Sequence, residues 1–135
     1  MWYPNIDELK ASNYITSKIS LAASSLKLME RALNKTYKEY KASLPQQLDE
    51  ATSLIDIKIK LNQVTLIHVL SKNIIDKFQN MNNAPEILKD FVIKDKCKKE
   101  EIINHLELGI EYNYSYLHPN LKSEFTSFKL PKKCY

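Results

Sequence analysis

Residues 57–70 read Ile57-Lys58-Ile59-Lys60-Leu61-Asn62-Gln63-Val64-Thr65-Leu66-Ile67-His68-Val69-Leu70, and their secondary structure decides the fold. As a helix, this stretch carries apolar side chains on nearly every side, which is typical of a central, covered element. As strands, residues 57–61 alternate and Asn62-Gln63 could form a hairpin turn. That turn lacks the glycine that tight hairpins prefer, and an isolated hairpin among helices would expose its edges. We therefore expect a helix.

The glycine content of the chain also favours helices. The sequence has 135 residues and one glycine, Gly109, where average usage would give roughly nine. Hairpins and phosphate-binding loops usually need glycine at positive φ, so architectures built on them are disfavoured. With 44% hydrophobic and 27% charged residues, the chain has the balance of a folded domain. We predict an all-α fold, a single helical domain over residues 1–135, with 119–135 as a basic tail that could fray.

Three capping patterns set the expected helix boundaries. Each places a capping residue three positions before Glu or Gln, so that side chains satisfy the first backbone N–H groups of a helix. The three patterns are Asn5-Ile6-Asp7-Glu8, Ser43-Leu44-Pro45-Gln46 and Asn83-Ala84-Pro85-Glu86. We expect an elongated helical hairpin or four-helix bundle with helices at 6–42, 45–80, 85–95 and 99–117.

The first expected helix carries apolar residues spaced by three and four positions. This spacing is close to the coiled-coil period and predicts a narrow seam that packs along another helix. We expect the seam to be the protein interface, formed by Ile15, Ile19, Ala22, Leu26, Met29, Leu33, Tyr37 and Tyr40.

Charge and targeting signals restrict the function classes. The formal net charge is +4, and Arg31 is the only arginine among 20 basic residues. Specific nucleic-acid recognition favours arginine, so the lysine excess argues against it. Neither a secretory signal nor an apolar run long enough for a membrane helix is visible. We expect a soluble, intracellular protein.

The histidines and cysteines match no known site pattern. His68 lies in the most apolar stretch, where a buried core histidine is the expected state. Cys97, His105, His118 and Cys134 do not follow a zinc-ligand spacing, and two cysteines are too few for a disulfide scaffold. We expect no catalytic residue, no cofactor, no metal site and no enzymatic activity.

These observations favour a non-catalytic scaffold, adaptor or assembly subunit. It would bind another helical protein, or a second copy of itself, through the coiled-coil seam. One alternative is a basic helical module that contacts nucleic acid or an anionic membrane surface, whose binding would weaken steeply with salt. Another is a pathogen effector or immunity-type protein that binds one protein partner.

Overall fold

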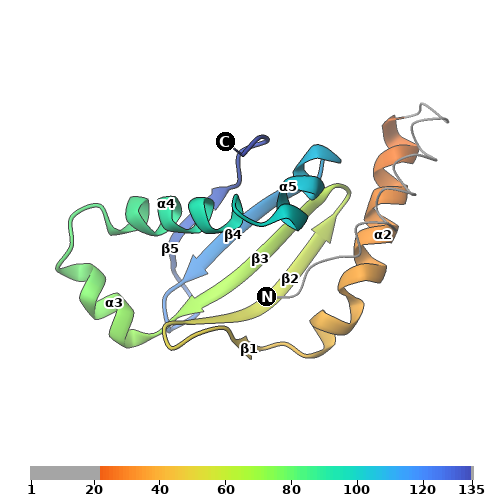
Figure 1. Cartoon of the computed structure of the whole chain (residues 1–135). Helices are drawn as coiled ribbons and strands as arrows, with labels where there is room; N and C mark the ends of the chain where they lie inside the picture. Colours follow the sequence, from red (N-terminus) through yellow and green to blue (C-terminus); the bar gives the residue numbers. More distant parts are fainter. Residues whose placement is uncertain (1–21, 135) are drawn as a thin grey trace.

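The computed structural model describes residues 22–134 and contradicts the all-α prediction, because a five-stranded mixed sheet forms the centre of the fold (Figure 1). The helices of this part are α2 (Ala22–Ala42), α3 (Lys72–Gln79), α4 (Ala84–Lys96) and α5 (Glu100–Glu107). The strands are β1 (Gln46–Gln47), β2 (Thr52–Lys60), β3 (Gln63–Leu70), β4 (Glu111–Leu117) and β5 (Glu124–Lys129).

The strands lie in the order β1-β2-β3-β4-β5, and only β3 and β4 are parallel to each other. Helices α3, α4 and α5 make the crossover between these two strands, as a parallel pair requires. Side chains alternate along β3 and β4, with one set buried and the next half-buried. The helices pack on the buried set, which we call the covered face. Residues 22–134 thus form a helical layer on one side of the sheet (Figure 1).

Residues 57–70 form the hairpin that sequence analysis rejected. Its turn lies at Leu61-Asn62, with Leu61 at a φ of 54°, a conformation that usually favours glycine. The N–H of Leu61 donates to the Glu30 carboxylate of α2 over 2.6 Å, and the Asn62 amide donates to the Gly109 carbonyl over 2.8 Å. Contacts from distant parts of the chain therefore hold a turn that carries no glycine.

The other expected helices are confirmed only in part. Residues 22–42 are helical, while 6–21 lie outside the described residues. The helix expected at 85–95 is confirmed as α4. The helix expected at 45–80 is wrong, because β1, β2 and β3 fill most of that range, and the helix expected at 99–117 ends at Glu107 before β4 begins.

The C-terminal residues do not fray over the described range. Residues 124–129 form β5, and Leu130 after it is only 2% exposed. A disulfide joins Cys97, at the end of α4, to Cys134. Two cysteines are too few for a disulfide scaffold, as the sequence indicates, but they form one bond that ties the C-terminal residues to α4.

The seam residues of α2 pack on the chain's own sheet. Met29, Leu33 and Tyr37 belong to the buried core, and the Tyr37 hydroxyl lies 3.0 Å from that of Tyr112 on β4. Leu26 is half-buried, and Tyr40 is half-buried against the core. Ala22 opens α2, whereas Ile15 and Ile19 lie outside the described residues. The coiled-coil-like role of this helix is wrong, because a sheet face can bury a helical stripe of the same spacing.

Among the helices within residues 22–134, none has both the length and the apolar character that a bilayer-spanning segment needs.

Leu33→Asp is expected to cost several kcal/mol of unfolding free energy, because Leu33 is 0% exposed and a carboxylate there would lie unpaired in the core. Urea denaturation followed by circular dichroism measures the loss. Asn34→Asp, which adds the same charge at an exposed neighbouring position, is expected to stay close to wild type. If Leu33→Asp kept its stability and instead lowered the solution mass, α2 would be an interface between chains and the packing described here would be wrong.

Candidate functional site

A polar cavity of about 260 Å³ lies between α4, the residues from β1 to β2, and the covered face of the sheet. We call it the α4 cavity. It adjoins the carboxyl ends of the parallel strands β3 and β4, the edge at which open α/β sheets commonly bind ligands. Its lining comprises Leu48, Asp49, Thr52, His68, Leu88, Phe91, Val92, Asp95, Lys96, Lys99 and Tyr116.

His68 of β3 forms part of the cavity lining. It is 1% exposed, which confirms the core histidine expected from the sequence. Its ring stacks on Tyr116 at 4.5 Å between centroids and on Tyr114 at 5.8 Å. Burial lowers the pKa of His68 to about 4, so the ring is neutral at pH 7. Because Nδ1 lies 3.2 Å from the Ser115 carbonyl, we assign its proton to that nitrogen.

Lys96 of α4 brings a buried positive charge to the same cavity. The residue is 7% exposed, and its Nζ lies 3.7 Å from the carboxylate of Asp95. Burial, together with the nearby charge of Lys99, lowers the pKa of Lys96 to about 8. Burial also raises the pKa of the Tyr116 hydroxyl, which therefore stays protonated. The cavity thus combines a buried ammonium and neutral aromatic groups with the carboxylates of the exposed residues Asp49 and Asp95.

One flank of α4 beside the cavity is apolar and open to solvent. Phe91 is 69% exposed and Ile87 is 45% exposed, and the two lie one helical turn apart on the same side of the helix. We call this pair the α4 flank. Its Phe91 also lines the α4 cavity. Adjoining exposed apolar side chains on a folded domain often mark an interaction site.

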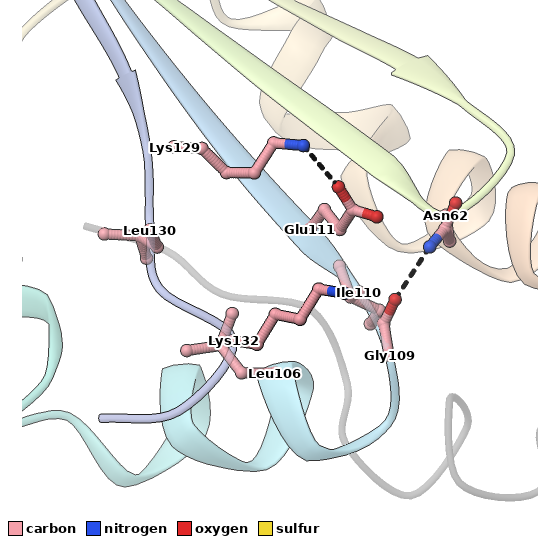
Figure 2. A pocket seen from close by; sticks show the side chains of 8 residues that line it. All are labelled: Asn62, Leu106, Gly109, Ile110, Glu111, Lys129, Leu130 and Lys132. Carbon is pink, nitrogen blue, oxygen red and sulfur yellow. Dashed lines mark hydrogen bonds and ion pairs between the residues drawn. The ribbon is translucent and has the colours of Figure 1, made fainter. Parts of the chain in front are cut away.

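A second hollow, of about 270 Å³, lies at the opposite end of β4 (Figure 2). Two of its charged residues are paired within the chain: Lys129 donates to Glu111 over 2.6 Å, and this hydrogen bond is the main cause that lowers the pKa of Glu111. Lys132, a third charged residue of the lining, is exposed. Asn62 and Gly109 are joined across the same hollow. We regard it as a structural junction between the hairpin turn, β4 and β5.

The remaining histidines and cysteines do not meet in one site. His105 of α5 is fully buried, with Nδ1 2.8 Å from the Tyr112 hydroxyl. The His118 ring makes a T-shaped, edge-to-face contact with the Phe125 ring. Within residues 22–134, no cluster of three or more histidine, cysteine or acidic side chains could hold a metal ion.

The sequence does not indicate the α4 cavity, although His68 stands out in its apolar stretch. Lys96 and Tyr116 lie far from His68 in the sequence, and no motif links the three positions. A signal for part of the cavity was present in Glu111–Leu117, where Tyr112, Tyr114 and Tyr116 alternate as one face of a strand. If residues 111–117 are taken as a helix, the three tyrosine side chains point in different directions and indicate no common face.

Acidification is expected to destabilise the protein through His68. The folded-state pKa is about 4 and the usual value is 6.5, so the unfolded chain binds the proton first. The contribution of neutral His68 to the free energy of unfolding is fully present above pH 6.5 and is lost as the pH falls towards 4. The expected loss between pH 7 and pH 4.5 is about 2 kcal/mol. Urea denaturation at several pH values measures this slope. His68→Gln should flatten it and His118→Gln should not; an unchanged slope in His68→Gln would contradict the assignment.

No protein-family profile matches the sequence, and no curated protein is significantly similar to it. Solved structures do share the fold. The pilotin EpsS of the Vibrio vulnificus type 2 secretion system aligns with a TM-score of 0.63 and 14% identity, over 79% of this chain and 88% of the pilotin. The type II secretion pilotin AspS of Vibrio cholerae aligns with a TM-score of 0.57 and 16% identity, over 79% and 89%.

A Pseudomonas aeruginosa protein thought to be secreted aligns with a TM-score of 0.63 and 14% identity, over 75% of this chain and 87% of that one. At these identities the likeness concerns the fold alone. It nevertheless corrects the functional expectation, because the neighbours are α/β proteins. The helical scaffold with a coiled-coil seam is wrong, and the basic helical module loses its structural basis as well.

Proposed function

We propose that this chain is a non-catalytic, pilotin-like component of a protein secretion system that acts by binding another protein. The observation that carries the proposal is the fold, which the chain shares with two type II secretion pilotins over 79% of its length. The corresponding segments make up 88% and 89% of the pilotins themselves. The structural similarity therefore extends over most of the domain and is not limited to one motif.

Two titratable groups of the α4 cavity, His68 and Tyr116, are better suited to binding than to proton transfer. A general base or acid works best with a pKa near the operating pH. Burial keeps His68 neutral and Tyr116 protonated, and the Nδ1 proton of His68 is directed at the Ser115 carbonyl. These two groups can orient a ligand, but they are poorly placed to transfer protons at pH 7. Lys96 has a pKa of about 8, in the range of a general acid or base, and the proposal of a non-catalytic role therefore rests on the fold.

We assign the protein-binding surface to the α4 flank. Aromatic side chains dominate the energetics of protein interfaces, and Phe91 exposes most of its surface in the isolated chain. Burying Phe91 and Ile87 against a partner would remove adjoining apolar surface from water. Lys94 and Asp90, exposed on the same helix, would lie at the polar rim.

A photo-crosslinking residue at position 91 tests this surface in the organism of origin. We expect one protein to be captured reproducibly from position 91, and the yield to fall at least about tenfold when Ile87→Asp is added. The exposed position Glu107 on α5 is the control and should not capture that protein. Equal capture from positions 91 and 107, or no capture from 91, would contradict the assignment.

We further propose an oxidising compartment, in place of the intracellular location expected from the sequence. The Cys97–Cys134 disulfide supports this, because such bonds persist outside the reducing cytosol. Thiol alkylation in intact cells, before any reductant is added, measures the state of both cysteines. We expect neither to be modified until the protein is reduced; alkylation of both without reductant would refute the oxidising location.

A further inference from the structure

We propose that the α4 cavity is a binding site for a carboxylate joined to a bulky apolar group. The inference does not depend on the proposed function, and none of the comparisons points to it. It is derived from the division of the cavity into an apolar part and a part with a buried positive charge.

The apolar part of the cavity suits the apolar portion of such a ligand. Leu48, Leu88, Phe91 and Val92 contribute apolar surface to the lining. The volume of about 260 Å³ exceeds the roughly 150 Å³ of an engineered protein cavity that binds benzene. One aromatic ring with a short chain therefore fits without rearrangement of the sheet.

The cationic part suits the carboxylate. Lys96 is buried and Lys99 is half-buried, and both line the cavity. The lining also holds two acidic groups: Asp95, whose carboxylate lies 3.7 Å from the Lys96 Nζ, and Asp49. Both belong to exposed residues, where water screens a charge more strongly than around the buried Lys96. Asp49 also accepts a hydrogen bond from the Ala51 N–H over 2.8 Å. An anion beside Lys96 would be attracted in a region of low dielectric, where charges interact most strongly.

The neutral groups of the lining are compatible with an anion. His68 and Tyr116 do not carry a negative charge at pH 7, so neither repels a carboxylate. The ammonium of Lys96, in contrast, is less stable in its present surroundings than in water, as its lowered pKa indicates. A bound carboxylate would stabilise that charged form and raise the pKa again.

Titration of the full chain with 3-phenylpropionate, followed by NMR of the lysine side chains, tests the site. We expect saturable binding, a rise in the Lys96 pKa on saturation, and binding of the neutral 3-phenylpropanamide at least about tenfold weaker. Lys96→Met should lose the preference for the acid over the amide, and Lys96→Arg should keep it. Lys98→Met, at an exposed position just after α4, should leave the preference unchanged.

A comparison of two ligands in the same titration identifies the source of the carboxylate. The peptide acetyl-Gly-Gly-Phe with a free carboxyl end binds if the site accepts the end of a protein chain, whereas binding of 3-phenylpropionate alone indicates a small organic acid. Equal affinity for the acid and its amide, or an unchanged preference in folded Lys96→Met, overturns the proposal. Loss of the preference in Lys98→Met also overturns the proposal, because the effect would then come from general surface charge.

Discussion

Burial of one face of the sheet is the constraint on which the rest of the structure depends. Val64 and Leu66 of β3 and Tyr112 and Tyr114 of β4 all point to the helical layer. The Tyr112 hydroxyl lies within 3.0 Å of Tyr37 on α2 and within 2.8 Å of His105 on α5. One strand residue therefore joins helices that are far apart in the sequence. Because α4 completes the same layer, this burial also creates the cavity beside Lys96.

The parts of the fold that the sequence predicts are those governed by local rules. Helix α4 has a proline in its first turn and an apolar stripe along one side. These two local signals predict a helix at 85–95, close to the observed Ala84–Lys96. The spacing of apolar residues in α2 also predicts its apolar stripe. That spacing does not reveal whether another chain or the chain's own sheet covers the stripe. Leu33 is buried either way, and only the position of the sheet distinguishes the two cases.

The hairpin and the cavity depend on contacts that no local rule contains. The absence of glycine from Asn62-Gln63 argues against a hairpin turn. The turn instead lies at Leu61-Asn62, where Glu30 accepts a hydrogen bond from a position 31 residues earlier in the chain. Likewise, His68, Lys96 and Tyr116 approach one another only because β3 and β4 are parallel and α4 crosses above them. The disulfide is of the same kind, since Cys97 and Cys134 become neighbours through the packing of α4 near β5.

The register of β3 against β4 tests the account most directly, because the covered face, the cavity and the likeness to the pilotins all require it. Solution NMR of the labelled full chain measures it through cross-strand nuclear Overhauser effects. The account predicts contacts that connect Val64 with Tyr112, Leu66 with Tyr114 and His68 with Tyr116 in parallel order. Helical contacts running without interruption through residues 57–70, with none between the two segments, would contradict it.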